Sequence, residues 1–143
     1  GHLWAIRHTS VVEIDRAGIL PATFSAMASA VYSLADLLAQ RHNIQLSMVL
    51  IDGNLLPPLD VPCQAVISGD SLSLSIAAAS VLAKVARDEV MRDLANTYPD
   101  YGWQTNAGYG TKSHQNALQE FGVTPHHRKS FAPIKNRLKK GSR

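Results

Sequence analysis

Two acidic residues follow short apolar segments in the first half of the chain. Asp52 comes after the run MVLI, and Asp70 comes after AVISG. If these segments are neighbouring parallel strands, both carboxylates emerge at the same edge of the sheet. They repel each other there unless a cation lies between them, and hard oxygen ligands in an open site favour Mg²⁺ or Mn²⁺. Two such ions can activate a water and stabilise the leaving oxygen in phosphodiester hydrolysis.

Local rules also allow each acidic residue a purely structural role. Asp52 stands before a glycine, which is a common hairpin-turn pair, and Asp70 could cap the helix behind it. The connector 53–62 is short for a parallel crossover, which normally takes a dozen or more residues. A two-metal site usually holds three or four carboxylates, and the chain offers no obvious third. Glu13 and Asp15 are better interpreted as part of a polar connection between a strand and a helix.

A second group of residues has the chemistry to contact nucleic acid. Tyr109 lies between two glycines, which let the backbone approach a ligand and leave the ring free to stack on a sugar or base. Lys112 adds a positive charge nearby. An alternative is that Tyr109 packs over the edge of the core. In the segment HHRKSF, Arg128, Lys129 and Ser130 could all bind phosphate oxygens.

The histidines and the single cysteine are weaker candidates. His126 and His127 are adjacent, so on an extended segment they point to opposite faces and grip one metal poorly. His114 falls on the apolar side of a short helix, where a structural role is the better interpretation. Cys63 is the only cysteine, which excludes an internal disulfide and fits a core thiol in a reducing compartment.

The charge of the chain is distributed unevenly. Seven of the 14 basic residues lie beyond His127 without an acidic neighbour, whereas the other seven share residues 1–127 with all 11 acids. A basic C-terminal segment suggests a polyanionic partner, although a solubilising tail gives the same pattern. No apolar run is judged to approach the about 18 residues of a membrane span, so no membrane partner is expected. The basic residues are Arg128, Lys129, Lys135, Arg137, Lys139, Lys140 and Arg143.

The elements that must position these residues form an α/β pattern. A strand is expected over 3–9, a helix over 19–43, and strands in LSMVLI and CQAVISGD, the first of them buried on both faces. The longest helix is expected over 73–98, followed by a loop over 99–113. A short helix over 113–121 should end at Gly122, and Pro133 should lie in the first turn of a last basic helix. The expected buried face of the longest helix consists of Ile76, Ala79, Ala83, Ala86, Val90 and Leu94.

Four strings in order resemble a known family. They are LIDGN, VISGDSLSLSIAAASVLAKVARDEVM, YGWQTNAGYGTKSHQNAL and TPHHRKSFAPIK, and together they resemble type 2 ribonuclease H, the bacterial ribonuclease HII. The similarity runs from about Trp4 to Leu138. It implies an α/β ribonuclease H-like fold, a mixed sheet flanked by helices with a helical C-terminal part. Residues 1–143 would form a single domain, within which 112–143 make a basic helical extension.

The resemblance also implies an activity. The family cuts the RNA strand of RNA/DNA hybrids and incises duplex DNA 5′ to an embedded ribonucleotide, using four acidic residues with Mg²⁺ or Mn²⁺. Asp52 and Asp70 match two of the four, and Tyr109 matches the tyrosine that stacks on the deoxyribose at the RNA–DNA junction. A cytoplasmic location and no obligate protein partner are implied. The phosphate contacts implied are Lys84, Lys112, Arg128, Lys129 and Ser130.

The chain departs from the family pattern in two places. The family's first strand bears an Asp-Glu pair followed closely by Gly-Arg-Gly, and the 143 residues contain no such string. We therefore expect the N-terminal strands of the fold to be missing, and the fragment to be inactive or weakly active and prone to associate through exposed sheet edges. In addition, Asn106-Ala107 stand where many members have His-Lys. The alternatives are a non-catalytic nucleic-acid-binding module and an α/β fold with no nucleic-acid role.

Overall fold

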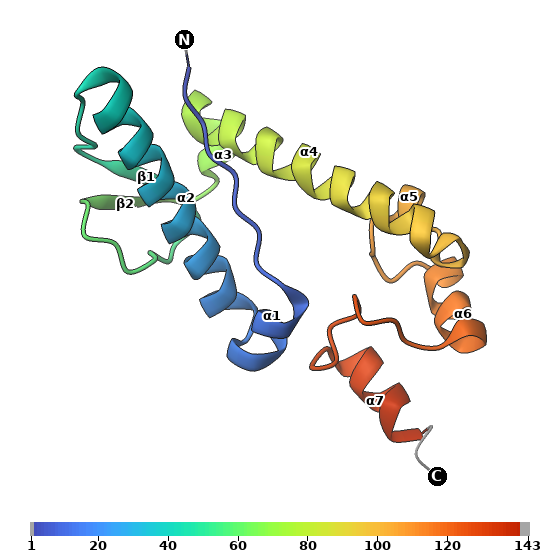
Figure 1. Cartoon of the computed structure of the whole chain (residues 1–143). Helices are drawn as coiled ribbons and strands as arrows, with labels where there is room; N and C mark the ends of the chain where they lie inside the picture. Colours follow the sequence, from blue (N-terminus) through green and yellow to red (C-terminus); the bar gives the residue numbers. More distant parts are fainter. Residues whose placement is uncertain (1, 141–143) are drawn as a thin grey trace. The chain divides into compact units, whose positions relative to one another are not determined.

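The structure is a computed structural model that describes residues 2–140, without the side chain of Lys140 (Figure 1). Arg143, counted above among the basic residues, lies outside the described range. The chain divides into two compact units, residues 1–82 and 83–143, and each is described by itself. The expectation of one domain with a basic extension over 112–143 stays a prediction.

The first unit begins with irregular chain and a short helix, not with the strand expected over 3–9. A strand needs a neighbour to pair its N–H and C=O groups, and no described strand lies beside this segment. Helix α1 (Val11–Ala17) follows, so the polar connection expected around Glu13 is wrong as well. Glu13 N–H donates to Ser10 Oγ, and Ser10 N–H donates to Glu13 Oε2, which makes a capping box. This backbone N–H of Ser10 lowers the pKa of the Glu13 carboxyl.

Helix α2 (Ile19–His42) confirms the second predicted element. It ends at Asn43, which takes the left-handed conformation with φ of 52°. By length and composition alone it could cross a membrane, and it is the only helix among the described residues that passes this test. The test is weak, because core helices of water-soluble proteins pass it too. Asp36 and several hydroxyl residues interrupt the apolar sequence of α2, so it contains no long unbroken apolar run although its average hydropathy is high.

Strands β1 (Val49–Asp52) and β2 (Cys63–Val66) are parallel. Val49 pairs with Cys63, and Asp52 pairs with Val66. The parallel arrangement is confirmed, and the hairpin alternative for Asp52 is therefore wrong. Each strand rises only about 13 Å at about 3.3 Å per residue, so the connector 53–62 is long enough to return without a helix.

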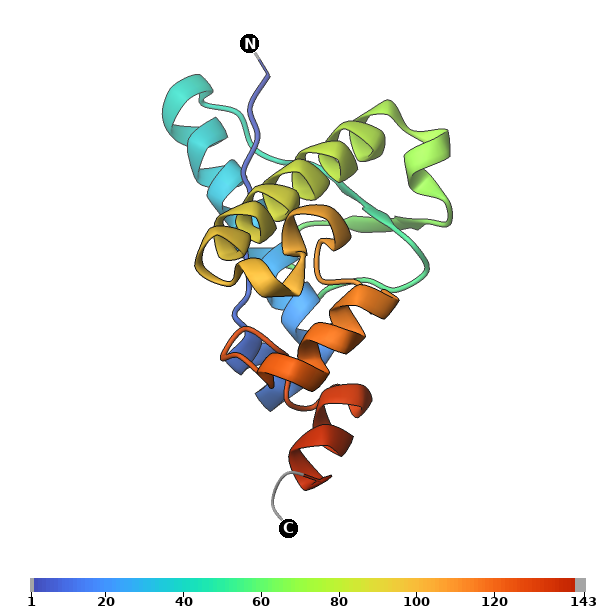
Figure 2. The same ribbon diagram turned by 90° about the vertical axis from the view of Figure 1, so that its right-hand side faces the viewer.

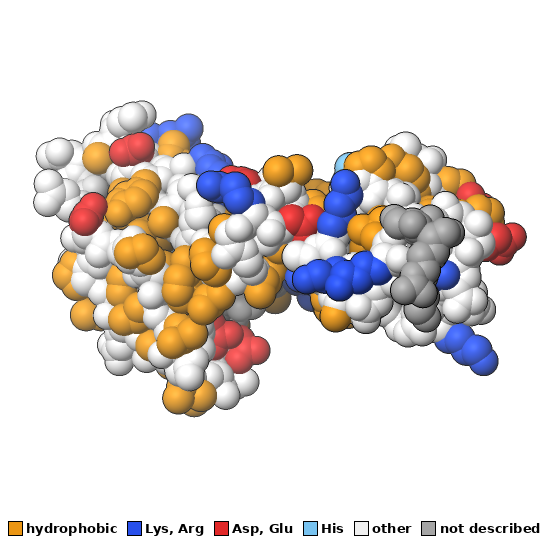
Figure 3. All heavy atoms as spheres, turned by 90° about the horizontal axis from the view of Figure 1, so that it is seen from below, with side chains coloured by type: hydrophobic (Ala, Val, Ile, Leu, Met, Phe, Trp, Pro, Cys, Tyr) orange, Lys and Arg blue, Asp and Glu red, His pale blue; other side chains and the backbone are white. Residues whose placement is uncertain are grey.

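The first strand is not buried on both faces, contrary to the expectation. Ile51 is buried, whereas Leu50 on the opposite face is 40% exposed. Only one face of this two-stranded sheet is covered by the described residues. Figure 3 shows hydrophobic side chains spread over the visible face of the first unit, the left-hand body of that view.

The chain leaves β2 through a single helical turn, α3 (Gly69–Leu72), and then reverses into α4 (Leu74–Thr97), as Figure 2 shows. The strand expected to reach Asp70 therefore ends at Val66. Helix α4 agrees with the predicted helix, but its predicted buried face does not. Ile76 is buried, whereas Ala79 and Ala83 are exposed, because sequence spacing does not say which side of a helix finds a neighbour.

The second unit is helical and has an aromatic core. It contains a 3-10 turn η1 (Pro99–Tyr101) and the helices α5 (Trp103–Asn106), α6 (Lys112–Phe121) and α7 (Ala132–Lys140). The loop expected over 99–113 thus holds two short helices, whereas the predictions for α6 and α7 are confirmed. Trp103 is 2% exposed, and its ring stacks on that of Tyr101 with 5.1 Å between the ring centres. The buried cluster comprises Ala95, Tyr101, Trp103, Ala117, Leu118 and Ile134.

Two buried histidines lie beside the aromatic rings. Their Nε2 atoms are 3.1 Å apart, which confirms a structural role for His114 and gives His127 the same role. The backbone N–H of Thr124 donates to His127 Nδ1 at 3.1 Å. Burial, and then the neighbouring His114, lower the pKa of His127 to about 4.

This shift predicts that the second unit is sensitive to acid. The pKa of His127 falls from 6.5 in the unfolded chain to about 4 in the folded one, so between these values the unfolded state binds more protons. The free energy of unfolding should therefore fall as pH drops through this range, by up to about 1.4 kcal/mol per pH unit for one such group. Urea unfolding across the range measures the effect.

The control for this prediction is a second histidine. His127→Gln should weaken the pH dependence, whereas His8→Gln, at an exposed position, should leave it unchanged. Equal pH dependence in His127→Gln and the parent chain would contradict the assignment.

Candidate functional sites

The carboxylate of Asp52 is exposed at the C-terminal end of β1, and one of its oxygens is held in place. The backbone N–H of Gly69 donates to Asp52 Oδ1 at 2.8 Å. The strand is fixed on the other side by Gly53 N–H, which donates to the carbonyl of Val66 at 2.9 Å. Among the described residues no hydrogen bond is made to Asp52 Oδ2. That oxygen is free to bind a cation.

Little room remains for a side chain at Gly69 beside this contact. A Cβ atom there would lie 2.6 Å from Ile76 Cδ1 and 3.3 Å from Asp52 Oδ1. Gly69 is buried and is the first residue of α3, so its N–H has no partner inside that helix. Sequence reasoning missed this residue. The signal that could have found it is a glycine directly before the second candidate carboxylate.

Asp70 follows Gly69 directly, so the structure joins Asp52 to the backbone beside Asp70. Asp70 is exposed and lies in the first turn of α3, not at the end of a strand as expected. The N-cap position belongs to Ser68, so the capping alternative for Asp70 is wrong too. The two carboxylates are therefore presented by different kinds of element, a strand end and a helical turn.

These residues fit a hard divalent cation in kind but not in number. Carboxylate oxygens at an exposed position are ligands for Mg²⁺ or Mn²⁺. Over residues 2–140, however, no group of three or more His, Cys, Asp or Glu side chains could hold a metal ion. Two carboxylates with water could bind one ion, but they are too few for a two-ion site.

In the second unit, Tyr109 presents its ring to solvent. Tyr109 is 69% exposed, so the alternative in which its ring packs over the edge of the core is wrong. The guanidinium carbon of Arg87 lies 5.2 Å from the centre of the ring. A cation over an aromatic face is attracted by the ring's quadrupole, and this contact steadies the ring while most of it stays accessible.

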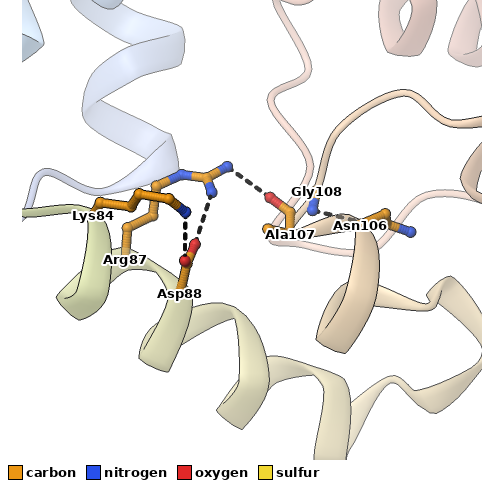
Figure 4. Close-up of polar contacts among 6 residues, drawn as sticks. All are labelled: Lys84, Arg87, Asp88, Asn106, Ala107 and Gly108. Atoms are coloured by element: carbon orange, nitrogen blue, oxygen red, sulfur yellow. Dashed lines mark hydrogen bonds and ion pairs between the residues drawn. The ribbon is translucent and has the colours of Figure 1, made fainter. Parts of the chain in front are cut away.

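Arg87 is a second residue that sequence reasoning missed. It extends from α4 and its Nη2 donates to the carbonyl of Ala107 at 2.6 Å (Figure 4). Its Nη1 is 3.7 Å from Asp88 Oδ1, and Lys84 Nζ is 2.7 Å from Asp88 Oδ2. The hydrogen bond from Lys84 lowers the pKa of Asp88. No local pattern could have predicted a contact between residues twenty positions apart.

The loop that carries Tyr109 is built by its own side chains as well. Asn106 Oδ1 accepts a bond from Gly108 N–H at 2.8 Å, and Asn106 Nδ2 donates to the carbonyl of Tyr101 at 2.8 Å (Figure 4 shows the first). Ala107 and Gly108 both have positive φ, 46° and 80°. At the position where the chain departs from the family pattern, Asn106 therefore orders the loop.

The remaining candidates also belong to the second unit, where Lys and Arg side chains (blue) lie on the face shown in Figure 3. Lys112 is exposed at the start of α6. Arg128 lies over the ring of Phe131, with 4.9 Å between the guanidinium carbon and the ring centre. Lys129 and Ser130 are exposed in the segment before α7. Tyr109 and these residues share one unit, whereas Asp52 and Asp70 belong to the other.

Comparison with known proteins identifies the family. The model of the family described as Ribonuclease HII matches residues 6–134. The chain belongs to the ribonuclease HII family. This confirms the resemblance, and the α/β architecture agrees with a ribonuclease H-like fold that has a helical C-terminal part.

Relatives in several bacteria share half or more of the aligned residues. Ribonuclease HII of Paracoccus denitrificans is 52% identical over 132 residues, covering 92% of this chain and 59% of the relative. Ribonuclease HII of Rhodospirillum rubrum is 55% identical over 129 residues, covering 90% and 56%. That of Paramagnetospirillum magneticum is 53% identical over 125 residues, covering 87% and 58%. The chain spans less than three fifths of the length of these relatives.

The packing at Gly69 leads to a test by substitution. Gly69→Ala should destabilise the first unit, because the new methyl group collides with Ile76 Cδ1; overpacking of this kind typically costs about 1–3 kcal/mol. Ile76→Val removes the colliding atom and by itself should cost about 0.5–1.5 kcal/mol. The double variant should therefore lose less unfolding free energy than the sum of the losses in the two single variants, as measured by urea unfolding. Strictly additive costs would contradict the close approach.

Proposed function

We propose that this chain supplies two of the carboxylates of a metal-dependent endoribonuclease. The observation that carries the proposal is the placement of Asp52 in a member of the ribonuclease HII family. Its carboxylate is exposed at the end of a parallel strand, and the N–H of Gly69 holds one oxygen at 2.8 Å. Asp70 is the residue that follows Gly69. A carboxylate fixed before a metal arrives loses little freedom on binding it.

The proposed substrates are the RNA strand of RNA/DNA hybrids and duplex DNA with an embedded ribonucleotide, which would be incised on its 5′ side. The name Ribonuclease HII of the relatives supports a substrate that contains RNA. Asp52 and Asp70 would hold Mg²⁺ or Mn²⁺ through their carboxylate oxygens. When bound, such ions supply an activated water and stabilise the leaving oxygen, and the products would have 3′-OH and 5′-phosphate ends.

We further propose that Tyr109 stacks on the deoxyribose at the RNA–DNA junction. Its exposed ring is steadied by Arg87, so the ring does not have to be ordered by the substrate. Lys84 is paired with Asp88 at an exposed position, where such pairs are weak enough to be exchanged for a phosphate. The proposed phosphate contacts are Lys84, Lys112, Arg128, Lys129 and Ser130.

The proposal also covers the cellular location and the partners of the protein. Cys63 is a free thiol, which fits the reducing cytoplasm. The proposal includes neither a membrane nor an obligate protein partner. A non-catalytic nucleic-acid-binding module is the alternative, and it is supported by the exposed ring of Tyr109 and the basic side chains of the second unit.

The chain by itself should be inactive or nearly so, because two carboxylates cannot hold two divalent ions. With Mg²⁺ or Mn²⁺ and a labelled duplex containing one ribonucleotide, we expect salt-dependent binding without incision. A chimera that adds the part of the Paracoccus denitrificans relative preceding the matched region should incise 5′ to the ribonucleotide. In that chimera, Asp52→Asn should reduce incision to the background.

The control and the contrary outcomes separate the proposals. Asp93→Asn, at an exposed position on α4, should leave incision by the chimera unchanged. Robust incision by the chain alone would overturn the expected inactivity. A chimera that binds the duplex and never cuts it would favour the binding module, and incision that survives Asp52→Asn would exclude Asp52 from the metal site.

A further inference from the structure

The backbone of Tyr109 is bonded to a buried histidine. His114 Nδ1 lies 2.9 Å from the carbonyl oxygen of Tyr109, and His114 itself is 5% exposed. Its other ring nitrogen, Nε2, lies 3.3 Å from Trp103 Nε1 and 3.1 Å from His127 Nε2. One side chain therefore connects the exposed loop to the core of the second unit.

The partners fix the proton positions on both rings. A carbonyl oxygen only accepts, so His114 Nδ1 carries the proton and donates to Tyr109. The indole N–H of Trp103 only donates, so His114 Nε2 accepts, in agreement with that tautomer. The backbone N–H of Thr124 only donates, so His127 Nδ1 accepts and its Nε2 proton is donated to His114. With these tautomers every ring nitrogen has a partner, and His114 Nε2 is shared by two donors, Trp103 and His127.

Other bonds hold this loop as well. The backbone N–H of Tyr109 donates to the carbonyl of Asn106 at 2.8 Å, and the N–H of Thr111 donates to the carbonyl of Tyr109 at 2.8 Å. Arg87 donates to the carbonyl of Ala107 at 2.6 Å, and Gln115 Nε2 donates to the carbonyl of Gly110 at 2.9 Å. Arg87 and Gln115 are exposed side chains, whereas His114, the side chain bonded to Tyr109, is buried. The ring of Tyr109 is largely exposed, so the bond from buried His114 ties its backbone to the core, in addition to the backbone bonds that Tyr109 makes with Asn106 and Thr111.

We propose that His114 is a positioning residue for Tyr109, held in the required tautomer by Trp103 and His127. The role deepens the proposed function, because it rests on Tyr109 contacting the substrate. A ring whose backbone is fixed meets the sugar without first losing conformational freedom, so removing the anchor weakens substrate binding and leaves the fold in place.

Two substitutions at His114 separate positioning from stability. His114→Gln places an amide oxygen near the former Nε2, where it accepts from Trp103 and His127, but it has no donor for Tyr109. His114→Asn places an amide N–H near the former Nδ1, where it donates to Tyr109, but it leaves the buried donors of Trp103 and His127 unpaired. We expect His114→Gln to keep the melting temperature and His114→Asn to lower it.

Two measurements on the full chain test the proposal. In ¹H–¹⁵N NOE experiments, His114→Gln should lower the values at residues 108–110, and His114→Asn should not. In fluorescence anisotropy with a short labelled duplex containing one ribonucleotide, His114→Gln should weaken binding about fivefold, the usual effect of one hydrogen bond. Unchanged order at 108–110 in His114→Gln, or a loss of order only in the less stable His114→Asn, would overturn the positioning role.

Tyr109→Ala distinguishes this proposal from the substrate role of Tyr109. We expect Tyr109→Ala to weaken binding, and His114→Gln to add nothing in that background. If Tyr109→Ala leaves binding unchanged, the substrate role of Tyr109 fails, and the NOE values alone decide whether His114 anchors the loop. If Tyr109→Ala weakens binding while His114→Gln does not, the substrate role survives and the positioning role is overturned.

Discussion

The backbone N–H of Gly69 donates to Asp52 Oδ1 at 2.8 Å. This contact depends on three features of the first unit. It needs β1 and β2 to be parallel, because only then does the chain leave β2 on the side where Asp52 ends β1. It needs α3 to begin where it does, because an unpaired helix N–H is the donor. It also favours glycine, since a Cβ atom at this position would lie 2.6 Å from Ile76 Cδ1 and 3.3 Å from both Asp52 Oδ1 and Val66 Cβ. The peptide N–H of Gly69 thus links the fold of this unit to the candidate metal ligand Asp52.

The second unit uses side chains for the same purpose. Tyr109 follows two successive residues with positive φ, a conformation that glycine adopts freely at position 108 and that is strained at Ala107. Hydrogen bonds made by Arg87, buried Asn106 and buried His114 support the loop. The histidine is in turn fixed by the aromatic core, so the aromatic residues of this unit determine both its stability and the presentation of the ring. An exposed binding residue is thereby connected to the most buried part of the unit.

Much of this could be predicted from the sequence where the signal is local. Spacing and helix ends were enough for α2, α6 and α7, and the strings around Asp52, Asp70 and Tyr109 were enough for the family. The rest depends on contacts that spacing does not encode. An apolar segment at the N-terminus has the composition of a strand but no described neighbour to pair with. Gly69 and Arg87 act on residues 17 and 20 positions away, so neither could be found before the chain was folded.

The central claim is that Asp52, oriented by Gly69, is a metal ligand. Paramagnetic broadening of ¹H–¹⁵N spectra during titration of the chain with Mn²⁺ tests this most directly, because the ion broadens the amides nearest to it. Broadening should appear first at the amides of Gly53, Gly69 and Asp70, and it should disappear from them in Asp52→Asn. Broadening that begins elsewhere, or that is the same in Asp52→Asn, would contradict the claim.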